Sequence, residues 1–151
     1  MKKYACRYAL VQFVPYSEAG EFANVGVVLI CPESGYFNFQ LQTRKSARVT
    51  AFFDKLKPAV YLTAIKVIQG ELARIGEAVA NAPSAESRAS YRRELFSGLV
   101  HPREAIVRFG TPRAVLTDSP KHELKRLFDH YVAGEQVFTG PLAYMTREAQ
   151  D

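Results

Sequence analysis

The stretch Gly20-Glu21-Phe22-Ala23-Asn24-Val25-Gly26-Val27-Val28-Leu29-Ile30 decides the fold of this chain. Side chains in a strand alternate between two faces. The odd-numbered positions from Ala23 to Cys31 are all apolar, and the even-numbered row is interrupted only by Asn24 and Gly26. Apolar side chains on nearly both faces predict a strand inside a sheet. Gly26 within it predicts a bulge or a close approach by another backbone.

The polar residues of this stretch have two interpretations. In the first, Glu21, Asn24 and Gly26 form a small polar notch, which makes Glu21 and Asn24 weak candidates for acid–base chemistry. In the second, they are a turn carboxylate, a hydrogen-bonded amide and a bulge, which the structural habits of Gly and Asn favour. No catalytic residue is assigned, and the sequence leans against an enzyme.

The composition is that of a soluble globular domain. The chain has 151 residues, 48% hydrophobic and 23% charged, which is enough for one domain with a core. The two cysteines, Cys6 and Cys31, make no disulfide framework, so we expect reduced thiols in a cytoplasmic protein. Arg7 interrupts the first apolar run, so we expect no signal peptide, and no run is long enough to span a membrane.

The predicted fold class is α+β, with an antiparallel sheet begun by a three-stranded N-terminal meander and helices packed on one face. We expect residues 1–133 to form a single domain, 81–90 to be a mobile linker, and 134–151 to be an irregular tail. The spacing and turn residues predict strands over 4–14, 21–31, 36–42, 106–109 and 114–117, and helices over 46–56, 58–79, 91–100 and 120–133.

The helix over 58–79 carries a stripe with coiled-coil spacing. Its members are Tyr61, Ile65, Ile68, Leu72, Ile75 and Val79. The stripe is too short to be specific for a coiled coil. Packing against the sheet is the favoured interpretation, and a dimer interface through residues 59–79 is the alternative.

The formal net charge is +5 and the pI about 9.3, which suits nucleic acid or an acidic partner. Three basic groups are candidates for binding an anion or a partner: Arg44, Lys45 and Arg48 at a helix entry; Arg88, Arg92 and Arg93; and Lys125 with Arg126. Cations at a helix entry oppose its dipole by roughly 0.3–1 kcal/mol. The alternative for each group is a solvated helix face.

The motifs of familiar chemistry are absent. The sequence has no P-loop, no G-x-G-x-x-G, no H-E-x-x-H and no G-x-S-x-G, which are signatures of nucleotide, zinc and hydrolase sites. His122 and His130 are about 12 Å apart along one helix, so they cannot share one ion. We therefore expect no metal and no cofactor.

Two separated blocks resemble a bacterial family known as domain of unknown function 3037. The first block is Tyr8 to Pro15 with Gly20 to Leu29, and the second is Pro112 to Thr117 with Glu123 to Phe128. The family has no established activity to carry over. Its members are often encoded beside a kinase-like protein resembling the HipA toxin family, so the resemblance implies a protein partner.

These observations rank three hypotheses for the function. The first is a small cytoplasmic binding module that acts through a protein partner, using Arg88, Arg92, Arg93, Lys125 and Arg126. The second is a nucleic-acid-binding protein that adds the basic group at 44–48, for which affinity falls with salt. The third is a phosphate-handling enzyme of unknown reaction built around Glu21, Asn24 and the basic group at 44–48.

Overall fold

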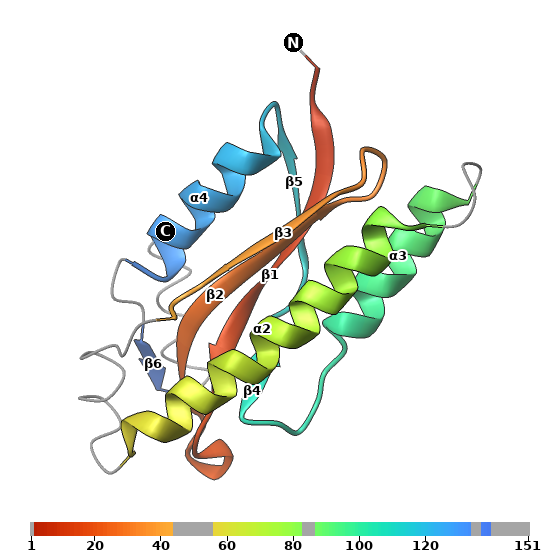
Figure 1. Ribbon diagram of the computed structural model, residues 1–151. Coiled ribbons are helices and arrows are strands. Elements are labelled where there is room, and N and C mark those ends of the chain that lie inside the picture. Colours follow the sequence, from red (N-terminus) through yellow and green to blue (C-terminus); the bar gives the residue numbers. More distant parts are fainter. Residues whose placement is uncertain (1, 44–55, 83–86, 134–136, 140–151) are drawn as a thin grey trace.

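The computed structural model describes residues 2–43, 56–82, 87–133 and 137–139. Its centre is a six-stranded antiparallel sheet in which β1, β2 and β3 form a meander (Figure 1). Both β4 and β5 pair with β1, and β6 pairs with β2. The strands are β1 (Tyr4–Phe13), β2 (Glu21–Cys31), β3 (Tyr36–Leu41), β4 (Val107–Phe109), β5 (Arg113–Thr117) and β6 (Val137–Thr139). The predicted α+β class and the meander are confirmed.

The described helices are α2 (Pro58–Ala80), α3 (Arg88–Leu99) and α4 (Pro120–Tyr131), with a short 3-10 turn, η1 (Ser17–Ala19). Pro58 and Pro120 each stand in the first turn of their helix, where the missing N–H costs no hydrogen bond. The hydroxyl of Ser119 accepts from the N–H of His122 at 3.3 Å, which caps the N-terminus of α4. The helix expected over 46–56 lies mostly outside the described residues.

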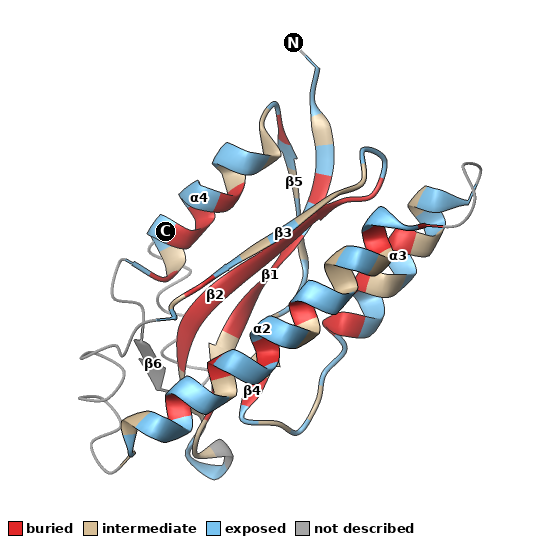
Figure 2. Cartoon of the chain, viewed as in Figure 1, coloured by how far each residue is buried: buried red, intermediate tan, exposed pale blue. Residues whose placement is uncertain are grey.

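The helices cover both faces of the sheet, and the prediction of one covered face is wrong in this respect. One core holds Val11, Val28 and Ile30 with α2 and α3, and the other holds Leu10 and Val27 with α4. Figure 2 shows β2 buried along its length between these layers. The physical reason lies in β2. Because this strand is apolar on both faces, both faces must be buried by packing against other elements.

The stripe along α2 packs against the sheet, which is the favoured interpretation. Tyr61, Ile65, Leu72 and Val79 are all buried in the core beneath the sheet. A dimer interface through residues 59–79 stays a prediction. Helix α3 begins at Arg88, so the last residues of the expected linker are helical. Three residues of the expected irregular tail form β6, which pairs with Glu21–Ala23.

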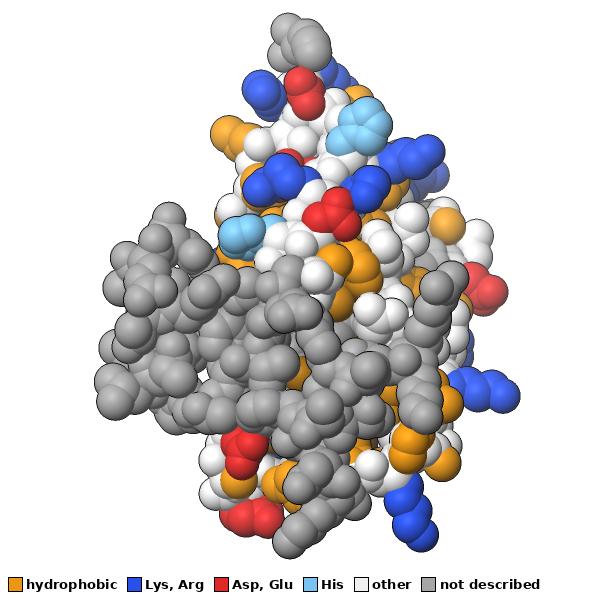
Figure 3. Space-filling view, turned by 90° about the vertical axis from the view of Figure 1, so that its left-hand side faces the viewer, with side chains coloured by type: hydrophobic (Ala, Val, Ile, Leu, Met, Phe, Trp, Pro, Cys, Tyr) orange, Lys and Arg blue, Asp and Glu red, His pale blue; other side chains and the backbone are white. Residues whose placement is uncertain are grey.

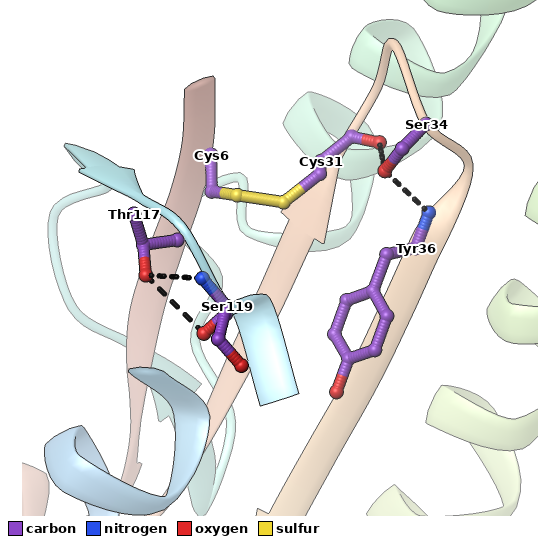
Figure 4. The surroundings of a disulfide bond; sticks show 6 residues. All are labelled: Cys6, Cys31, Ser34, Tyr36, Thr117 and Ser119. Atoms are coloured by element: carbon purple, nitrogen blue, oxygen red, sulfur yellow. Dashed lines mark hydrogen bonds between the residues drawn. A yellow bond between two sulfur atoms is a disulfide. The ribbon is translucent and has the colours of Figure 1, made fainter. Parts of the chain in front are cut away.

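The two cysteines form a disulfide between β1 and β2, so the expectation of reduced thiols is wrong. Cys6 and Cys31 face each other across the register that pairs Arg7 with Ile30 (Figure 4). Both are buried under α4. Disulfides are typical of oxidising compartments, so the thiols no longer argue for a cytoplasmic location, which stays a prediction.

Candidate binding surfaces

The expected polar notch is divided between the two faces of the sheet. Ala23 and Val25 both lie in the core with α2, so Asn24 between them points toward the other face. The pairing of β2 with β1 then shifts by one residue, as a bulge does. Gly26 consequently faces α2, where a Cβ would lie 2.5 Å from a methyl of Leu41. The predicted bulge and close approach are confirmed, and Asn24 and Gly26 do not converge.

Asn24 and Glu21 do not form an acid–amide pair either. Glu21 shares a strand face with Ala23 by alternation, and its backbone pairs with Thr139 of β6. The side chain of Asn24 is 3% exposed, and neither polar atom of its amide has a hydrogen-bond partner in the described part of the chain. The structure therefore brings no general acid or base to Asn24 from its predicted neighbours.

The arginines of α3 have different surroundings. Arg92 is 8% exposed, and its guanidinium donates to the carbonyls of Val79 at 3.0 Å and Pro32 at 3.2 Å. It ties the end of α2 to the β2–β3 turn, and so it contacts the interior. Arg93 is exposed and lies 3.8 Å from a carboxylate oxygen of Glu33. Arg88 is exposed as well, so only two of the three are available to a partner.

Lys125 and Arg126 of α4 are exposed but paired. Lys125 donates to Asp129 at 2.9 Å, and Arg126 donates to Glu123. The bond to Glu123 is also the main cause that raises the pKa of Arg126. Basic, acidic and histidine side chains intermingle on this face of the molecule (Figure 3). The face is therefore mixed in charge, and the group at Arg44, Lys45 and Arg48 lies outside the described residues.

An apolar groove of about 600 Å³ lies between α2 and the segment that leads from α3 into β4. Val60, Val67 and Ile106 line it, and they are 39%, 68% and 38% exposed, respectively. Its lining comprises Ala59, Val60, Thr63, Ala64, Val67, Ile68, Glu71, Arg103, Ala105, Ile106 and Val107. We define this set as the α2–β4 groove. Contiguous exposed apolar surface on a small protein is typical of a binding site.

The two charged residues that line this groove, Arg103 and Glu71, form an ion pair with each other. The two guanidinium nitrogens of Arg103 lie 3.3 Å and 3.0 Å from the two carboxylate oxygens of Glu71. Arg103 also donates to the carbonyl of Leu99 at 2.8 Å and lies 5.1 Å from the ring centre of Phe109. A bidentate pair fixes both side chains, so the groove offers apolar contacts and little net charge.

This groove was not predicted from the sequence. Val60, Ala64 and Val67 are spaced four and three residues apart beside the main stripe of α2. This second apolar row is the feature of the sequence that could have indicated the groove. A helix whose apolar face is this wide has more apolar surface than packing against one sheet face buries. Its other wall is the segment before β4, which lies next to α2 only in the folded chain.

A second cleft of about 300 Å³ lies between β3 and α4, with polar and basic side chains around a lining that is mostly apolar and includes Phe39 and Leu124. Its walls carry Tyr36, Asn38 and Gln40 on β3 and Lys121, His122 and Lys125 on α4. The hydroxyl oxygen of Tyr36 is buried and has no hydrogen-bond partner in the part that the structure describes. We name this space the β3–α4 cleft. Its donors and cations suit an anionic group.

Two tyrosines have perturbed pKa values. Burial raises the pKa of Tyr61, whose hydroxyl donates to the carbonyl of Gln42 at 2.6 Å. Burial also raises the pKa of Tyr8, and Tyr131 adds to the rise. Tyr61 and Tyr8 support the two cores, and neither lies in the groove or the cleft.

The described residues contain no group of three or more His, Cys, Asp or Glu side chains that could hold a metal ion. Within the same residues, no helix is long and apolar enough to cross a membrane.

Comparison with known proteins gives one match. The model of a family described as "Protein of unknown function (DUF3037)" matches residues 8–132. No curated protein and no solved structure matches the chain.

Proposed function

The chain belongs to the family described as Protein of unknown function (DUF3037), and we propose that it is a small binding module that acts through a protein partner. The observation that carries the proposal is the α2–β4 groove with its exposed Val60, Val67 and Ile106. The partner contributes an apolar segment to this groove. A kinase-like partner remains the prediction that the family resemblance suggests.

The chemistry of the groove favours an apolar segment as its occupant. Arg103 and Glu71 satisfy each other, so a charged group on the partner would be desolvated there without a counter-charge. Burial of apolar surface contributes about 25 cal/mol per Å². Val67 is the most exposed of the lining side chains that carry this apolar character. An uncharged, aliphatic or aromatic surface on the partner is therefore the best complement.

The shape favours a protein over a small molecule. Sites for small ligands enclose roughly 70–90% of the ligand surface. Here Val67 is 68% exposed and both Val60 and Ile106 are more than a third exposed, so the groove is open along its length. Protein interfaces are built on such open apolar patches with polar residues at the rim.

The other two hypotheses have less support. Nucleic-acid binding relied on the basic groups, but Arg92 is buried against backbone carbonyls and both Lys125 and Arg126 are paired with carboxylates. A phosphate-handling enzyme relied on Glu21, Asn24 and the basic group at 44–48. Glu21 and Asn24 lie on opposite faces of β2 by the alternation described above, and the basic group lies outside the described residues. Of the described residues on which these two hypotheses rely, Lys125 lines the β3–α4 cleft, and Glu21 and Asn24 line neither the groove nor the cleft.

The test compares two variants of the same helix. Val60 and Leu62 are each 39% exposed on α2, but only Val60 lines the groove. The tagged protein is purified from its host with nuclease, the co-purifying protein is identified by mass spectrometry, and its affinity is measured with purified components. Val60→Glu and Val67→Glu should each weaken binding by at least about tenfold, or about 1.4 kcal/mol. Leu62→Glu should leave the affinity unchanged.

Three outcomes would contradict the proposal. One is equal loss of affinity in all three variants, which would place the contact elsewhere. Another is loss of the co-purifying material on nuclease treatment. The third is a lone protein that carries a small apolar molecule in native mass spectrometry. Melting curves of the variants verify that each is folded, so that loss of binding reports on the groove.

A further inference from the structure

The outer edge of β3 carries backbone groups that the sheet does not use. Among the described residues, β3 pairs with β2 alone. The N–H of Phe39 donates to the side-chain oxygen of Asn38 at 2.8 Å, so it points away from β2. In an antiparallel ladder the direction alternates along the strand. Phe37 and Leu41 therefore also present their N–H and C=O groups at the outer edge.

The two sides of this edge differ in character. Phe37 and Phe39 pack on the α2 side, where their rings contact each other edge to face. Asn38 and Gln40 face the α4 side and line the β3–α4 cleft. Figure 1 shows β3 running between α4 on one side and α2 on the other. A strand added at this edge would place alternate side chains on an apolar side and on a polar side.

The cleft is basic and its donors are not all used. Lys121 and His122 are exposed on α4, and Lys125 shares its charge with Asp129 on the helix surface. An exposed ion pair of this kind stabilises a protein by roughly 0–1 kcal/mol. Lys125 can therefore leave Asp129 for a carboxylate of a partner at a small cost in free energy. Tyr36 also lines this cleft, and its buried hydroxyl has no partner among the described residues.

We propose that the outer edge of β3 binds an extended, acidic segment of a protein partner as an added strand. The backbone of the segment pairs with Phe37, Phe39 and Leu41, and its carbonyl replaces the side-chain oxygen of Asn38 as the acceptor of the Phe39 N–H. Its acidic side chains lie in the β3–α4 cleft near Lys121 and Lys125, and its alternate, apolar side chains lie beside Phe37 and Phe39. Strand addition of this kind takes affinity from the backbone and specificity from the pockets.

This inference does not rest on the α2–β4 groove. The groove lies on a different side of α2 from Phe37. A Cβ at Gly76 would lie 3.3 Å from the ring of Phe37, and Gly76 is about two and a half helical turns from Val67 of the groove. Val60→Glu and Val67→Glu should therefore leave binding at β3 unchanged. Failure of one proposal is in this way distinguished from failure of the other.

The test uses a short capped peptide of alternating valine and glutamate, titrated into the labelled full chain and followed by NMR. We expect saturable shifts of the amides of Phe37, Phe39 and Leu41, with affinity that falls as salt rises. A peptide with lysine in place of glutamate should not bind. A glutamate peptide methylated on alternate amide nitrogens has the same charge but cannot pair, and it should lose at least about tenfold in affinity.

A matched pair of protein variants completes the experiment. Lys121→Glu reverses a charge in the cleft near the start of α4, where an acidic residue suits the helix dipole, so the fold should be kept. It should weaken binding at least about tenfold, whereas Lys66→Glu, an exposed site on α2, should not. Equal binding of the methylated peptide, equal effects of the two variants, or no saturable shift up to about 1 mM peptide would overturn the inference.

Discussion

The Cα atoms of Cys6 and Cys31 lie 4.3 Å apart across the two central strands, and a disulfide joins their side chains. This is the spacing of directly opposed residues that do not exchange backbone hydrogen bonds, for which about 4.5 Å is typical. The cross-link therefore requires the register in which Arg7 pairs with Ile30. It connects residues 25 apart in the sequence.

Reduction of this disulfide should lower the free energy of unfolding by about 3 kcal/mol, because the open loop regains conformational entropy in the unfolded chain. Denaturant titrations with and without reductant measure the difference. The double variant Cys6→Ala with Cys31→Ala is the control, since reductant should not change its stability. Two free thiols in the unfolded, unreduced protein would contradict the prediction.

Replacement of Arg92 by methionine should destabilise the protein by about 2–4 kcal/mol, because the carbonyls of Val79 and Pro32 each lose a charged donor. Arg93→Met is the matched control on the next residue. Its side chain is 49% exposed and forms only a 3.8 Å pair with Glu33, so its effect should stay within about 0.5 kcal/mol. Similar losses in both variants would show that Arg92 does not tie α2 to the turn.

Tyr61→Phe should lower stability at neutral pH by about 1–3 kcal/mol, because the Gln42 carbonyl loses its donor. Burial raises the pKa of Tyr61 above its ordinary 10.0, so the wild-type advantage is complete below about pH 10 and is lost as pH rises further. The gap between the two proteins should narrow by roughly 1.4 kcal/mol per pH unit there. Urea titrations at neutral and alkaline pH test this, and a constant gap would contradict it.

Gly26→Ala should destabilise the protein by about 1–3 kcal/mol, since its Cβ would lie 2.5 Å from Leu41 Cδ2 and 2.9 Å from the carbonyl oxygen of Gln40. The contrasting variant is Gly70→Ala. No atom lies within 4 Å of a Cβ there, and alanine favours a helix by about 1 kcal/mol over glycine. Opposite signs in the two melting temperatures are the expected result.

Much of the fold could be predicted because the signals are local. The alternation in β2 and β3 and the spacing along α2 identify strands, a helix and their buried faces, since side-chain direction repeats with a fixed period. Pro58, Ser119 and Pro120 mark helix starts for equally local reasons. Gly26 indicated the bulge and the close approach because a strand glycine often has one of these uses. The candidate surfaces were less predictable, since each combines segments far apart in the chain.

The sequence by itself determined the α+β class, the meander, the core stripe of α2 and the family, because periodicity and motif order are properties of the chain alone. Only the tertiary structure decided that Cys6 meets Cys31, that Arg92 is buried, and that α4 takes the second face of the sheet. It alone decided that α2 and the segment before β4 enclose a groove. The physical reason is that the hydrophobic pattern of a segment indicates which of its faces is apolar. The strand register and the path of the connecting segments determine which residues cover that face.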